Sequence, residues 1–146
     1  MKKKVSRSEA GFTLTEIMVV VFIIGLLSTV VLVNVLGART DAQTKTAQAN
    51  IAALTQSLER YSLQLYTYPT EQQGLEALVE APTDLSDASL YPRGGFIQKL
   101  PNDPWGRPYQ YVFPGERSRA AYDVFSFGAD GQEGGEEENA DIGNWG

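Results

Sequence analysis

The oxygen-bearing side chains near the C terminus are the residues of this 146-residue chain best suited to bind a metal ion. Between Ser126 and Gly146 no residue is basic and six are acidic: Asp130, Glu133, Glu136, Glu137, Glu138 and Asp141. The chain contains no Cys and no His, which excludes disulfides, thiolate nucleophiles, the usual zinc sites and a Ser-His-Asp triad. An ion bound by carboxylates and carbonyls alone would be a hard cation, calcium or magnesium.

This acidic segment is either a solvated tail, as charge runs usually are, or a loop closed around a cation. Glycines that suit tight turns recur along it: Gly128, Gly131, Gly134 and Gly135. Ile142 and Trp145 near its end are apolar and should pack against a folded head. A closed loop would bring many carboxylates together, and a cation held by Asp130, Asp141 and carbonyls would offset their repulsion. The spacing is not that of an EF-hand.

Glu16 lies at the edge of an apolar run, where a bare carboxylate is costly and indicates a function. Its side chain either reaches the membrane interface or pairs with a cation at the same depth. If the chain is cut after Gly11, the new α-amino group of Phe12 is such a cation. That pair would form within the first helical turn, where a carboxylate also complements the helix dipole, or between two helices offset along a filament.

The apolar run extends from Ile17 to Ala38 without a charged residue. At about 1.5 Å per residue, a helix of this length covers the roughly 30 Å of a bilayer core. A buried core helix is the alternative, but a domain this small could not surround it. Basic residues precede the run: Lys2, Lys3, Lys4 and Arg7. Because positive flanks stay in the cytoplasm, we expect a single-pass protein of a bacterial inner membrane, with a cytoplasmic N terminus and a periplasmic head.

The helix is expected to continue to Tyr66. One apolar stripe recurs at spacings of three and four residues: Ala47, Ile51, Leu54, Leu58, Tyr61 and Leu65. Neither Pro nor Gly occurs between Ala38 and Tyr68, and Pro69 ends the pattern. The stripe is either a coiled-coil seam or a surface packed against a globular head, and the pattern favours the head.

The residues after Tyr66 predict a small α+β head. Thr70–Gln73 has the pattern of a capping box and precedes a short amphipathic helix that ends before Pro82. Residues 109–113 and 122–127 predict two strands joined through Pro114-Gly115. We therefore expect a small antiparallel sheet packed on the striped half of the long helix.

The segment Gly11-Phe12-Thr13-Leu14-Thr15-Glu16-Ile17, between a basic leader and an apolar run, closely resembles the class III signal of type IV pilins and pseudopilins. The resemblance implies that a prepilin peptidase cuts between Gly11 and Phe12 and then N-methylates Phe12. It assigns to Glu16 the recruitment and register of subunits. One departure is Val33, at a position where many relatives carry a helix-kinking proline.

Three further segments resemble the major pseudopilins of type II secretion systems, so that the likeness covers nearly the whole chain: residues 100–106, 122–131 and 139–145. The resemblance implies a type IV pilin-like fold whose C-terminal loop binds a structural calcium ion. The implied ligands are the side chains of Asp130 and Asp141, the carbonyls of Phe127 and Gln132, and Glu138 or Asn139. Type IV pilins usually close this region with a disulfide, which this chain cannot form.

The predicted function is that of a structural, non-enzymatic subunit that polymerises into a periplasmic filament driving protein export. The alternatives are a type IV pilus or minor pseudopilin subunit, and an anchored calcium-binding module that never polymerises. The predicted organisation is a cleaved leader at 1–11, a membrane-spanning and filament-core helix at 12–38, and a periplasmic head at 39–146. Expected partners are further copies of the chain in a helical filament, minor pseudopilins, the inner-membrane assembly platform, the prepilin peptidase and membrane lipid, but no nucleic acid.

Overall fold

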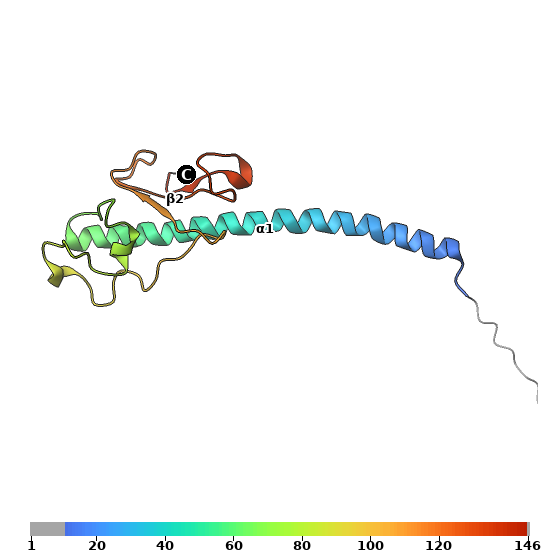
Figure 1. Cartoon of the computed structure of the whole chain (residues 1–146), viewed down its shortest axis with the longest axis horizontal. Helices are drawn as coiled ribbons and strands as arrows, with labels where there is room; N and C mark the ends of the chain where they lie inside the picture. The colour runs from blue at the N-terminus through green and yellow to red at the C-terminus, as the bar shows by residue number, and fades with distance from the viewer. Residues whose placement is uncertain (1–10, 146) are drawn as a thin grey trace, which may run out of the picture. The chain divides into compact units, whose positions relative to one another are not determined.

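The computed structural model describes residues 11–145, apart from the side chains of residues 30–36. The predicted leader therefore lies outside the described residues, except for Gly11. The chain divides into two compact units, one ending at Arg39 and the other beginning at Thr40. Its elements are α1 (Leu14–Leu65), η1 (Leu75–Leu78), η2 (Ala88–Leu90), β1 (Gln110–Val112), β2 (Asp123–Ser126), η3 (Glu137–Asn139) and β3 (Ile142–Gly143) (Figure 1).

Helix α1 begins and ends within two residues of its predicted limits, and its helical backbone runs through Val33 without a break. In the unit of the chain that ends at Arg39, the described large apolar side chains of α1 are exposed, Leu14, Met18 and Phe22 among them. The hydroxyl of Ser28 donates to the Ile24 carbonyl at 2.7 Å, so this polar group is satisfied inside the helix. No helix among the described residues is both long enough and apolar enough to cross a membrane.

The apolar stripe of α1 forms one side of the core of the second unit. Five of its residues are at most 4% exposed: Ala47, Ile51, Leu54, Leu58 and Tyr61. All of these except Ala47 form one cluster with buried side chains of the head: Leu75, Leu78, Tyr109, Tyr122 and Val124. The prediction that this half of the helix packs on a globular head is confirmed.

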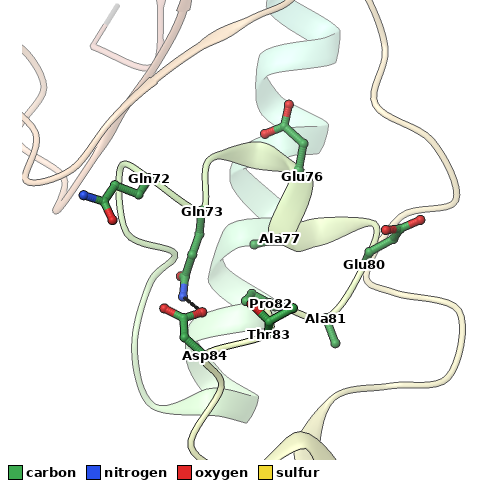
Figure 2. Close-up of a pocket in the computed structure, with 9 residues that line it drawn as sticks. All are labelled: Gln72, Gln73, Glu76, Ala77, Glu80, Ala81, Pro82, Thr83 and Asp84. Atoms are coloured by element: carbon green, nitrogen blue, oxygen red, sulfur yellow. Dashed lines mark hydrogen bonds between the residues drawn. The ribbon is translucent and has the colours of Figure 1, made fainter.

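The short helix predicted after Pro69 is present as a 3-10 helix that begins later than expected, at Leu75, and its capping box forms. The Thr70 amide donates to Gln73 Oε1 at 2.9 Å, and the Gln73 amide donates to Thr70 Oγ1 at 3.2 Å. Gly74 then adopts a left-handed φ of 60°, which ends the turn, and only the short 3-10 helix η1 follows. Gln73 also connects this turn to the loop after Pro82, because its side-chain amide donates to Asp84 Oδ1 at 2.8 Å (Figure 2).

The sheet has three antiparallel strands in the order β1-β2-β3. Gln110 pairs with Phe125, and Phe125 pairs on its other side with Gly143. All four residues of β2 are buried, because this strand is central in the sheet and packs on α1. The two predicted strands are present but shorter than expected, and β3 was not predicted as a strand.

Candidate functional site

The N-terminal motif forms a hydrogen-bonded cap at the start of α1. Glu16 Oε2 accepts hydrogen bonds from the amide of Thr13 at 2.8 Å and from its hydroxyl at 2.9 Å. The Glu16 amide donates in return to Thr13 Oγ1 at 3.2 Å. Thr13 is therefore the N-cap residue and Glu16 the third helical residue of a capping box. In the full-length chain the carboxylate is bound to Thr13; Phe12 is joined to Gly11, so the amino group expected after cleavage is not tested.

Gly11 and Phe12 lie outside the helix and are open to solvent. Neither residue belongs to α1, and the Phe12 side chain is 83% exposed. A Cβ added at Gly11 would meet no atom within 4 Å. A peptide bond to be cut by a protease must be accessible in non-helical backbone, and the bond between these two residues meets that condition.

The acidic C-terminal segment is a closed loop rather than a free tail. The Ala129 amide donates to the Glu138 carbonyl at 3.0 Å, and the Asp141 amide donates to the Gly134 carbonyl at 3.1 Å. Gly128, with a φ of 68°, leaves no room for a side chain because a Cβ there would lie 2.7 Å from the Ala140 carbonyl oxygen. The tight glycine turns expected from the sequence are therefore present.

The end of the loop is fastened to β2. Asn144 bridges this strand, because its Oδ1 accepts from the Val124 amide at 3.1 Å and its Nδ2 donates to the Tyr122 carbonyl at 3.0 Å. The Trp145 ring lies 5.4 Å from the ring of Phe125, and Ile142 packs against the core. The prediction that the apolar residues near the end of the chain pack on the head is confirmed.

The beginning of the loop is fastened by a turn around Asp103, a buried carboxylate. Asp103 Oδ1 accepts from the Arg107 amide at 2.8 Å, and Oδ2 accepts from the Ser126 hydroxyl at 2.6 Å. The Arg107 guanidinium then donates to the carbonyls of Gly128 and Ala129. Arg107 thus binds backbone oxygens of the loop and none of its carboxylates.

Asp141 is the best placed of the predicted ligands. Its side chain is 8% exposed, and its Oδ2 accepts from the Gly134 amide at 3.0 Å and from Arg117 at 2.7 Å. Its Oδ1 is buried without a hydrogen-bond partner among the described residues. A buried carboxylate oxygen without a donor is costly, and a hard cation is a chemically suitable partner.

The other predicted ligands are less closely gathered. Asp130 is exposed, and its Oδ1 accepts from the Gln132 amide at 3.0 Å. Glu138 Oε2 accepts from the Thr40 hydroxyl at 3.3 Å, while its carbonyl is bound to the Ala129 amide. The carbonyls of Phe127, Gln132 and Asn139 belong to the same loop. Within residues 11–145, no three acidic side chains cluster as metal ligands would.

Arg117 is the residue of this site that the sequence did not reveal. It lies in the hairpin loop between β1 and β2, and its guanidinium binds both Asp141 and Glu133. The hydrogen bond with Asp141 raises the pKa of Arg117 above its ordinary value. The sequence offers one signal for this role: Arg117 and Arg119 are two basic residues between the predicted strands of a chain that also has an acidic loop.

A second set of acidic side chains lines a pocket near η1 but does not converge. Figure 2 shows Glu76 and Glu80 pointing away from each other, while Asp84 is bound to Gln73. Paired carboxylates for acid-base chemistry must face a common point, and these do not.

Comparison with known proteins places the chain in one family. The model of the family described as type II secretion system, protein G, matches residues 34–145, and that of the prokaryotic N-terminal methylation motif matches residues 6–32. The type II secretion system core protein G of Vibrio cholerae is 50% identical over 145 residues, which cover 99% of this chain and 96% of that protein. That of Pseudomonas aeruginosa is 46% identical over 139 residues, covering 95% and 96%.

The fold also matches a solved structure of the same family. The crystal structure of the major pseudopilin from the type 2 secretion system of enterohaemorrhagic Escherichia coli superposes with a TM-score of 0.65 at 39% identity, covering 77% of this chain and 94% of that one. The predicted α+β, pilin-like architecture of a long helix and a small antiparallel sheet is thus confirmed. The chain belongs to the protein G family of type II secretion systems, the family of their structural major pseudopilins.

Proposed function

We propose that this chain is cut after Gly11, N-methylated at Phe12, and polymerised into a periplasmic filament that drives export by the secretion machinery. The observation that carries the proposal is the pairing of an exposed, capped N-terminal motif with a run of exposed apolar side chains on α1. Those side chains need a cover that the isolated subunit does not provide. Membrane lipid covers them before assembly and the helices of other copies cover them afterwards.

The partners follow from the same proposal. The prepilin peptidase acts on the Gly11–Phe12 bond, and the inner-membrane assembly platform and minor pseudopilins receive the processed subunit. Residues 12–38 anchor the chain in the inner membrane with the head in the periplasm. Once Phe12 carries a free amino group, Glu16 exchanges its contact with Thr13 for that cation, in its own helix or in a neighbouring one.

We also propose that the C-terminal loop binds calcium. Asp141 supports this most strongly, because its Oδ1 is buried and unpartnered among the described residues. Asp130, the carbonyls of Phe127 and Gln132, and an oxygen of Glu138 or Asn139 would complete an all-oxygen set of the kind calcium prefers. The ion would neutralise carboxylates and stabilise the head without any disulfide.

Cysteine cross-linking tests the filament. Because the chain has no Cys, single cysteines at exposed positions such as Met18 or Phe22 report contacts between copies without background. In cells that also produce the assembly machinery, mild oxidation of these variants should yield disulfide-linked dimers, the largest product that one cysteine per chain allows. Adding Glu16→Gln should reduce the yield roughly tenfold or more, because it leaves the amino group without a charged partner.

The matched control for Glu16→Gln is Glu71→Gln, an exposed carboxylate in the head, and this change should leave the cross-links intact. If no disulfide-linked dimer forms from any cysteine position, the chain does not polymerise and the proposal is wrong. If the dimers form equally well with Glu16→Gln, then Glu16 does not recruit or register subunits.

A further inference from the structure

Arg117 presents a fixed positive charge to the acidic C-terminal loop. We propose that Arg117 is the positioning residue of this loop: it closes the loop onto the head without any metal and holds Asp141 in the orientation that a cation requires. The second half of this inference rests on the proposed calcium site, and the first half does not.

The backbone that carries Arg117 is held rigidly. The hairpin loop turns around the carboxylate of Asp123, which is 1% exposed. Asp123 accepts from the backbone amides of Glu116, Arg117 and Ser118, each at 2.7 Å. The Ser118 hydroxyl donates to the Tyr122 carbonyl, also at 2.7 Å. The turn therefore fixes the point at which the Arg117 side chain leaves the backbone.

The guanidinium of Arg117 joins three parts of the structure. It donates to Asp141 Oδ2 at 2.7 Å and also binds Glu133, so it spans both sides of the loop. It lies 5.2 Å from the centre of the Phe125 ring on β2 and 5.5 Å from that of Trp145. These distances are those of cation–π contacts, and the side chain is 34% exposed.

No other described cation makes an ion pair with this loop. Arg107, the nearest alternative, binds loop carbonyls and forms its ion pair with Asp103 instead. Arg117 thus supplies the positive charge that lets the loop close. Arg117 and the Gly134 amide both donate to Oδ2 of Asp141. The other oxygen, Oδ1, thus remains available to a cation. Partners that fix a ligand in this way contribute strongly to metal affinity.

The test compares Arg117→Gln with Arg119→Gln in the full-length chain in detergent. Arg119 lies two residues away in the same hairpin loop and makes no ion pair among the described residues. In EDTA, Arg117→Gln should lower the melting temperature by roughly 5 °C and speed cleavage between Glu133 and Glu138 by a Glu-specific protease. Arg119→Gln should do neither, and Arg117→Lys should recover part of the loss because it keeps the charge.

Calorimetric titration with calcium tests the orientation of Asp141. Arg117→Gln should weaken calcium binding about tenfold. Tighter calcium binding by Arg117→Gln than by the wild type would show that Arg117 competes with the ion. A melting temperature and a cleavage rate in EDTA equal to those of the wild type would show that Arg117 does not close the loop. Either result overturns the inference. If the wild type binds no calcium yet Arg117→Gln still opens the loop, the calcium site is wrong and the closing role of Arg117 stands.

Discussion

Removing calcium with EDTA should lower the melting temperature of the full-length chain by roughly 10 °C or more. A ligand at a hundred times its dissociation constant stabilises the folded state by about 2.7 kcal/mol. In a head of this size each kcal/mol changes the melting temperature by several degrees. The proposed ion would offset the charge of a C-terminal loop that carries six acidic residues in a chain without Cys.

Replacing Asp141 with Asn should abolish the effect of calcium. The substitution Asp141→Asn keeps the size of the side chain, but it removes the charge that pairs with Arg117 and that the proposed calcium ion would use. The matched control is Glu136→Gln, because Glu136 is an exposed acid of the same loop outside the predicted ligand set. In thermal unfolding, calcium should raise the melting temperature of the wild type and of Glu136→Gln by a large amount, and that of Asp141→Asn hardly at all. If the melting temperature of the wild type is the same with and without EDTA, the proposed calcium site is contradicted.

Replacing Asp123 with Ala should destabilise the chain by about 3 to 5 kcal/mol. The buried carboxylate accepts three backbone N–H groups at 2.7 Å, and its loss leaves all three without a partner. Denaturant unfolding of the full-length chain measures the loss. Asp41→Asn, at an exposed position of α1, should cost almost nothing. A loss below about 1 kcal/mol for Asp123→Ala would mean that water replaces the carboxylate at little cost.

The contribution of Asp123 should also depend on pH. Burial raises the pKa of Asp123, but hydrogen bonds from Ser118, Arg117 and Glu116 outweigh burial and hold the pKa below its usual value. A carboxylate whose pKa is depressed by folding stabilises the folded state above its unfolded pKa, about 3.9 for Asp. The stability difference between the wild type and Asp123→Ala should therefore be full above about pH 4 and shrink as the pH falls through the folded pKa.

The parts of the fold that local pattern controls could be predicted from the sequence. The stripe from Ala47 to Tyr61 is buried as expected because helical period alone places these side chains on one face. The helix end is also local: Tyr66 takes a left-handed φ of 61°, and Pro69 follows three residues later. The capping box predicted at Thr70 forms because it needs only residues three apart, and the same spacing at Thr13 gives a second capping box that was not predicted.

The parts that depend on distant contacts could not be predicted in the same way. Strand β3 is two residues long and lacks an alternating pattern, so only its pairing with β2 and the bridge through Asn144 identify it. Gly74 lies within the segment predicted as a short helix, and only the structure shows the positive φ that ends the turn there. Arg117 acts on residues 16 and 24 positions away in the sequence, which no local spacing reveals.

The central claim is that the chain is processed as a pseudopilin. It is tested most directly by mass analysis of the N terminus, on protein isolated from the membranes of cells that also produce the secretion machinery. Processing as a pseudopilin predicts a chain that begins at Phe12 and carries one additional methyl group on its α-amino nitrogen. Gly11→Ala provides a matched variant in which cleavage should fail and the leader should be retained. A wild-type chain that still begins at Met1, or that is cut after the apolar run rather than before Phe12, would contradict the account.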